Sequence, residues 1–150
     1  MDDLDRTILQ VLQTQGRATN ADLARTVNLS QPAVHARLRR LEEAGIIQGY
    51  VALLDRERLG YDMLCFIHIS LKQHTPETVA DFRAAMQDLS EVLECHHVTG
   101  EFDYLLKVAI RNRPDLERFV VDRLTPVPGI GRIHTSLALA EVKYTTALPI

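Results

Sequence analysis

The chain has 150 residues, of which 46% are hydrophobic and 25% charged, the composition of an ordinary globular protein. No apolar run approaches the roughly 18 residues of a membrane span, and no secretory signal opens the sequence, so we expect a soluble cytoplasmic protein with no membrane partner. Two cysteines are too few for a disulfide scaffold. Neither a Gly-rich phosphate loop nor a CxxC motif is present, and we expect neither catalytic residues nor a cofactor.

The net charge of −3 argues against a nucleic-acid partner only until its distribution is considered. Residues 1–60 carry eight arginines and eight acidic residues, and no acid lies between Gln31 and Leu41, where Arg37, Arg39 and Arg40 follow one another. Screening limits distant charges to about 8–10 Å, so a local basic strip can bind DNA on an acidic chain.

The first 45 residues predict three short helices. Apolar residues recur at helical spacing in three groups: Leu4, Ile8, Val11 and Leu12; Leu23, Ala24 and Val27; Val34, Leu38 and Leu41. Thr19 and Ser30 are capping residues for the second and third helices. Only Asn28 and Leu29 separate the second helix from Ser30, and so tight a turn makes the helices cross steeply, as in a helix-turn-helix.

The remainder predicts a wing, a linker and a second domain. Residues 46–53 have the β-branched content of a short strand pair or wing. Residues 54–60 form a linker, because the stretch from Asp55 to Gly60 is polar and ends in glycine. Beyond them we expect strands at 63–71, 92–98, 104–110 and 133–142, with helices beginning at Thr75 and Pro114. That order is the βαββαβ pattern of ferredoxin-like folds. The predicted class is α+β: a winged helix-turn-helix domain (1–53), the linker, and a ferredoxin-like domain (61–150) whose tail, 143–150, packs back.

Both helices of that domain should cover one face of the sheet. The other face then carries Leu64, Phe66 and His68, a surface too apolar to remain in water. The sequence therefore predicts a symmetric homodimer.

The third predicted helix is the candidate DNA-reading element, because a helix-turn-helix places its second helix in the major groove. His35 and Arg39 point outward, and Gln31 sits at the exposed N-terminal end of the helix, where base edges are usually met. Arg37 lies nearer the core, where it is a phosphate contact or a packing stem. The candidate contacts are Ser30, Gln31, His35, Arg37, Arg39 and Arg40. The plainer alternative is that these arginines form a solvated face.

The stretch from Val98 to Val108 is unusual for a strand entry. Gly100 frees the backbone to meet a carboxylate, and Asp103 offers a carboxylate to an ammonium, the two charges of a free amino acid. The alternative is an ordinary hairpin turn in which Asp103 bonds its own backbone.

Several segments together resemble the Lrp/AsnC (feast/famine) family of bacterial and archaeal transcription regulators. They are Leu4-Asp5-Arg6-Thr7-Ile8-Leu9, Leu29-Ser30-Gln31-Pro32-Ala33-Val34, Leu38-Arg39-Arg40-Leu41-Glu42-Glu43-Ala44-Gly45-Ile46-Ile47, and Gly100 to Val108. The resemblance spans the whole chain. It implies a helix-turn-helix that binds double-stranded DNA and an amino-acid-sensing domain, often called RAM. It also implies homodimers, often assembled as octamers of four dimers.

The resemblance further implies that an amino acid or related metabolite binds at the contact between dimers. By match, its site comprises Gly100, Phe102, Asp103, Tyr104, Thr135 and Ser136. Two alternatives share the architecture: an enzyme resembling the decarboxylases of modified tetrapyrroles such as siroheme, and an effector sensor that does not bind DNA. The effector, target promoters and sign of regulation do not follow from the sequence.

A metal site is not expected at Glu94, Cys95, His96 and His97. Neighbours on a strand point to opposite faces, so the two histidines cannot share an ion. Cys65, on the apolar face, is expected to be a small core residue.

Overall fold

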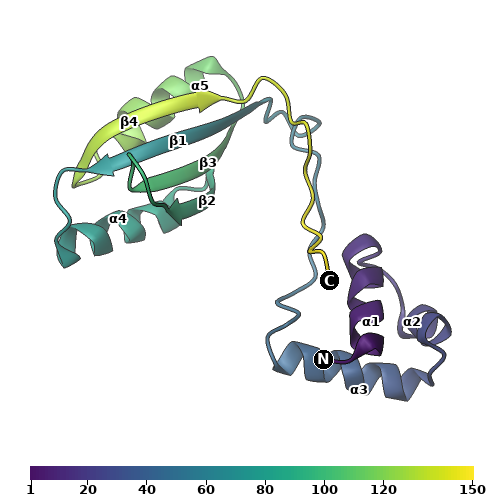
Figure 1. Cartoon of the computed structure of the whole chain (residues 1–150). Coiled ribbons are helices and arrows are strands. Elements are labelled where there is room, and N and C mark those ends of the chain that lie inside the picture. Colours follow the sequence, from purple (N-terminus) through teal and green to yellow (C-terminus); the bar gives the residue numbers. More distant parts are fainter. The chain divides into compact units, whose positions relative to one another are not determined.

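The structure is a computed structural model that describes residues 1–150. Contacts divide the chain into two units, Met1–Leu53 with Val142–Ile150, and Leu54–Glu141 (Figure 1). None of the helices combines the length and apolar character needed to cross a membrane.

The first unit contains three helices, α1 (Asp3–Thr14), α2 (Asn20–Val27) and α3 (Gln31–Glu43). Asp2 and Thr19 open α1 and α2 with capping boxes, and Ser30 caps α3. The core is drawn from all three helices: Ile8, Leu23, Ala24, Val27, Val34 and Leu38. The predicted three helices and the tight turn between α2 and α3 are confirmed.

Residues 46–53 form no strand in the single chain, so the expected strand pair is corrected. The backbone N–H groups of Ile46 and Ile47 both donate to the Leu41 carbonyl and finish α3. The residues that follow have no neighbouring strand to pair with, and a strand requires such a partner. Tyr50, Val51 and Leu53 are exposed.

The second unit contains β1 (Met63–Leu71), α4 (Pro76–Asp88), β2 (Val92–His97), β3 (Tyr104–Ile110) and α5 (Arg113–Arg118). A π-helical stretch, η1 (Phe119–Leu124), continues α5, and β4 (Ile130–Leu137) completes the unit. The sheet order is β2-β3-β1-β4 with antiparallel neighbours throughout. The predicted βαββαβ order is confirmed.

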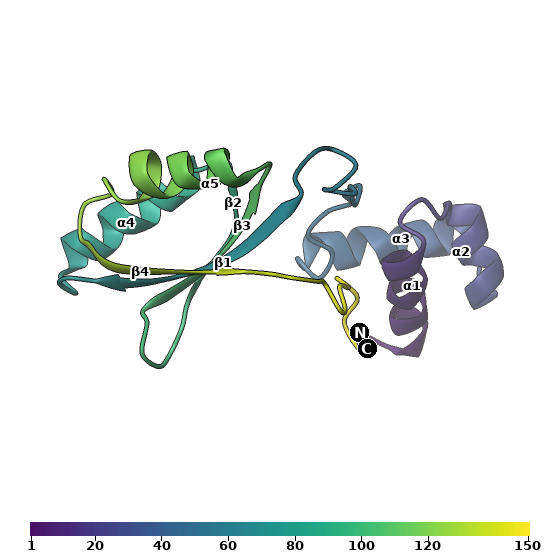
Figure 2. The same cartoon turned by 90° about the horizontal axis from the view of Figure 1, so that it is seen from above.

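The two faces of the sheet differ. Helices α4 and α5 lie on the same face (Figure 2), above a core that includes Cys65, Ile67, Leu106, Phe82 and Phe119. The core position expected for Cys65 is confirmed. Phe66 and His68 alternate with the core residues of β1 and therefore belong to the opposite face, which we call the open face.

One predicted strand near the C-terminus had the wrong bounds, and the tail groups with the other unit. The last strand is Ile130–Leu137 rather than 133–142, because its ladder follows β1, pairing Leu71 with Ile130 and Cys65 with Leu137. The second domain was expected to include the tail, yet Val142–Ile150 groups with the first unit. The cause is α1, where the Gln13 side-chain amide donates to the Leu148 carbonyl at 3.1 Å.

Residues 54–60, expected as a linker, group with the second unit. They form a tight turn in which the Tyr61 N–H donates to the Arg56 carbonyl and the Arg56 guanidinium donates to the Tyr61 carbonyl, each at 2.8 Å.

Candidate nucleic-acid interface and ligand site

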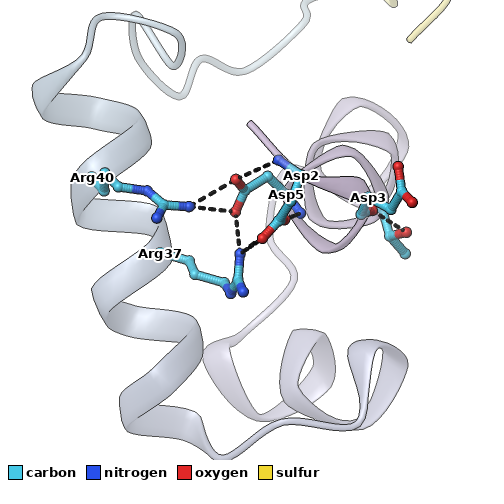
Figure 3. Close-up of polar contacts among 6 residues, drawn as sticks. Asp2, Asp3, Asp5, Arg37 and Arg40 are labelled. Atoms are coloured by element: carbon cyan, nitrogen blue, oxygen red, sulfur yellow. Dashed lines mark hydrogen bonds and ion pairs between the residues drawn. The ribbon is translucent and has the colours of Figure 1, made fainter.

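Helix α3 is anchored to α1 by a cluster of two acids and two arginines (Figure 3). The Asp5 side chain is completely buried, and its carboxylate accepts from Arg37 at 2.7 Å and from Arg40 at 2.8 Å. Arg37 also donates to Asp2 at 2.7 Å. The candidate contacts Arg37 and Arg40 therefore hold the helix in place.

The electrostatics of the cluster favour the ionised acids. The backbone N–H of Asp5, followed by Arg37, lowers the pKa of Asp2 to about 2. Burial raises the pKa of Asp5, but the hydrogen bonds from the Asp2 N–H and from Arg37 outweigh it, and the net shift is downward. Arg37 is only 22% exposed, whereas Arg40 is 60% exposed and can still reach a phosphate.

The outward residues of α3 are Gln31, His35 and Arg39, which share one face of the helix and are exposed. Gln31 and His35 border a shallow depression together with Asn20 at the start of α2. Arg39 binds Glu43 through Nε at 2.7 Å, and its terminal nitrogens make no hydrogen bond. Gln31, His35 and Arg39 therefore present unpaired donors and acceptors of the kinds that read base edges.

Ser30 directly precedes Gln31 at the N-terminus of α3, and its role is structural. Its hydroxyl oxygen accepts from the Ala33 N–H at 3.4 Å and caps α3. Sequence reasoning missed the role of Asp5 and Asp2. The available signal was an acid pair at the start of α1 facing two arginines three residues apart on α3.

The hairpin between β2 and β3 is closed by the Val98 N–H, which donates to the Asp103 carbonyl at 2.9 Å. Gly100 has a φ of 120°, a conformation that favours glycine. The Asp103 carboxylate accepts from the Leu71 N–H and bonds the His74 ring, each at 2.8 Å. Although burial raises its pKa, these two hydrogen bonds bring the pKa of Asp103 below its usual range. Asp103 thus ties the hairpin to the end of β1.

The structure does not bring all six predicted effector residues to one place. Tyr104 is buried on the helix-covered face, 4.5 Å from the Phe82 ring, and its hydroxyl has no hydrogen-bond partner. In the β1–β4 ladder Thr135 pairs with Ile67, on the helix-covered face, whereas Ser136 pairs with Phe66, on the open face. Thr135 and Ser136 therefore point to opposite sides of the sheet.

Phe102 reaches the open face, where sequence reasoning missed its neighbours. Its ring centroid lies 5.0 Å from that of His68 and 6.0 Å from that of His134, and the Arg132 guanidinium lies 4.6 Å from it. The register of β1 and β4 and the fold of the β2–β3 hairpin bring these side chains together, and no short sequence motif signals it.

The acid and the two histidines of β2 follow the strand alternation. His96 bonds Glu94 at 3.0 Å on the open face, whereas the His97 ring stacks 4.8 Å from Tyr104 on the other side. No group of three or more potential metal ligands is present.

Each of the two units matches the model of a known protein family. A family model described as winged helix-turn-helix DNA-binding matches residues 1–48, and one described as Lrp/AsnC ligand binding domain matches residues 64–148. The chain belongs to the Lrp/AsnC family. This Lrp/AsnC protein is a transcriptional regulator with a DNA-binding helix-turn-helix and a ligand-binding domain, which confirms the resemblance, the fold class and the general function.

Similar proteins support the assignment over the full length. The Leucine-responsive regulatory protein of Salmonella typhimurium is 39% identical over 150 residues, which cover all of this chain and 92% of that protein. A crystal structure of a transcriptional regulator from Neisseria meningitidis in complex with L-Met is 39% identical, with a TM-score of 0.95 over 99% of this chain and 96% of the other. A feast or famine regulatory protein from M. tuberculosis, complexed with L-methionine, is 31% identical, with a TM-score of 0.89 over 98% and 97%.

Proposed function

We propose that this Lrp/AsnC regulator binds double-stranded DNA through α3, with Gln31, His35 and Arg39 reading bases, Ser30 and Arg37 positioning the helix, and Arg40 contacting a phosphate. The single observation that supports this most strongly is that Arg37 and Arg39 differ in their contacts. Arg37 is ion-paired with Asp2 and Asp5. Arg39 projects from the same helix, and its terminal nitrogens are free to donate hydrogen bonds. Such an arrangement fixes the reading face before DNA arrives.

The protein acts as a homodimer, and further as an octamer of four dimers, in the cytoplasm without a membrane partner. The open face supports the dimer because Phe66, His68 and Leu105 lie there only half-buried. Pairing two such faces removes apolar surface from water. Phe66→Asp should convert dimers to monomers in sedimentation experiments, while Thr135→Asp, on the other side of the sheet, should leave them intact. Dimers that persist in Phe66→Asp would reject the open face as the interface.

The effector is an amino acid or related metabolite that binds at the hairpin of Gly100, Phe102 and Asp103, with Ser136 from the open face of β4, at a contact between dimers. Tyr104 and Thr135, predicted for the same site, lie on the helix-covered face and are left out of it. Complexes of two similar regulators with L-methionine support this. Because Asp103 already bonds Leu71 and His74, its role is to shape the hairpin, and an arriving ammonium must share its carboxylate. The effector alters DNA binding only insofar as it prefers one assembly state, and a coupling of about 1–3 kcal/mol corresponds to about 5–150-fold.

The deciding experiment is capture of random genomic fragments by the purified protein at about 0.15 M salt, repeated with a mixture of the twenty amino acids. Enrichment of fragments sharing a near-palindromic site, altered by the mixture, is expected. A dimer that neutralises about six to eight phosphates should show a log–log salt slope of about −5 to −7. Absence of enrichment in both conditions would refute the proposal.

A further inference from the structure

The second unit contains a mixed-charge cavity of about 500 Å³, away from the hairpin of residues 98–103. It lies at the end of β3, and its lining comes from the β1 entry, the α4–β2 turn, α5 and η1. Part of its wall is apolar, since Ala109, Ile110 and Phe119 are buried. A volume of this size is within the range of small-molecule sites.

Three guanidiniums and three carboxylates line this cavity, and two of each neutralise one another. Arg123 binds Glu91 at 2.6 Å, and Arg118 binds Asp115. Arg111 and Asp122 remain, and neither takes part in an ion pair or a side-chain hydrogen bond. The cavity therefore offers one free cation and one free anion.

Arg111 is nevertheless held in place. Its guanidinium lies 5.2 Å from the centre of the Tyr61 ring, a contact that orients the group without neutralising it. A stacked guanidinium keeps its edge free for two parallel hydrogen bonds to a carboxylate. Asp122, the unpaired acid of the lining, lies in the first turn of η1, and π-helical turns occur frequently at functional sites.

We propose that this cavity binds the zwitterion of a free α-amino acid, with Arg111 holding the carboxylate and Asp122 the ammonium. The site is separate from the effector hairpin and goes beyond the function proposed above. It adjoins the turn of residues 56–61, because Tyr61, which stacks on Arg111, is bonded through both its backbone groups to Arg56. A carboxylate that binds Arg111 therefore lies next to the turn that precedes β1, inside the second unit.

The test is equilibrium dialysis of the full-length protein against each of the twenty radiolabelled L-amino acids, with wild type, Arg111→Gln, Asp122→Asn and, as a matched control, Arg113→Gln. Arg113 is exposed on α5 and does not line the cavity. For at least one amino acid, Arg111→Gln and Asp122→Asn should each weaken binding about tenfold or more, because each removes a charged hydrogen bond. Arg113→Gln should bind like wild type.

Two further readouts locate the site. The 2-oxo acid analogue of the bound amino acid should bind about tenfold more weakly or worse, because it has no ammonium for Asp122. The bound amino acid should also protect Arg111, and not Arg113, from modification by phenylglyoxal, measured by peptide mass spectrometry. Phe102→Ala, at the hairpin, should leave this protection intact, which separates the cavity from the effector site.

The proposal is overturned if no amino acid binds differently to wild type and to the Arg111 and Asp122 variants. It is equally overturned if protection of Arg111 disappears with Phe102→Ala, because the ligand would then occupy the hairpin.

Discussion

Each unit of this regulator uses a carboxylate to anchor the element that we assign to binding, but Asp5 is completely buried whereas Asp103 is 24% exposed, and the two are held differently. Asp5 lies between two arginines and a backbone N–H, and it fixes a helix. Asp103 meets one backbone N–H and one imidazole, and it fixes a hairpin. A helix that is held by two arginines, which stay charged at all ordinary pH values, is rigidly positioned for reading DNA. A loop that is held by fewer and weaker contacts can adjust to a ligand.

The largest effect should come from Asp5→Ala. It leaves Arg37 and Arg40 without their buried partner, and we expect a loss of about 2–3 kcal/mol, less than for a wholly buried pair because both arginines reach water. Hydrogen exchange measured by mass spectrometry on peptides from residues 1–45 should accelerate. The control is Asp3→Ala, because the Asp3 side chain points away from the cluster (Figure 3). Equal exchange in both variants would contradict the anchoring role.

Arg39→Ala should weaken DNA binding by about 1–3 kcal/mol, tenfold or more, without changing stability or assembly. Fluorescence anisotropy on a captured site measures the affinity. Arg58→Ala is the matched control, since Arg58 is also an exposed arginine paired with a nearby acid on its own segment. Unchanged affinity in Arg39→Ala would remove α3 from the groove.

Asp103→Ala should cost about 1–2 kcal/mol locally, because the Leu71 N–H loses its acceptor. We expect normal DNA binding and loss of the response to the amino acid that alters fragment capture. Asp88→Ala, an exposed acid at the end of α4, serves as control. A variant that keeps full effector affinity would refute the hairpin as the site.

The smallest effect should be a loss of stability at acidic pH. The pKa of Asp2 and that of Asp22 are each lowered to about 2, for Asp22 by the Thr19 side chain first, so their stabilisation is complete above about pH 4 and is lost as the pH falls through 2. Asp2→Asn should lower the urea midpoint at pH 5 but match wild type near pH 2. A constant difference across this range would show that the charge of Asp2 is not involved.

Local sequence was enough to predict the order of the helices and of the four strands of the sheet, though not every boundary. Caps at Asp2, Thr19 and Ser30, and apolar spacing through Ile8, Leu23 and Val34, specify α1 to α3, because these interactions act within one or two turns. The alternation of apolar residues along β1 likewise predicts a strand with one buried face. The strand expected within residues 46–53 failed because a strand needs a neighbour, and propensity does not supply one.

The sequence by itself determined the order of elements, the tight turn of the helix-turn-helix and the family, since these reside in short-range patterns. Tertiary structure alone decided that Arg37 binds Asp5 while the terminal nitrogens of Arg39 stay unpaired, and that Thr135 and Ser136 point to opposite faces of the sheet. It also decided that the tail joins the first unit and that Arg111 and Asp122 share a cavity. Each of these outcomes depends on contacts between residues distant in the chain, and their register and pairing are set only when the units fold.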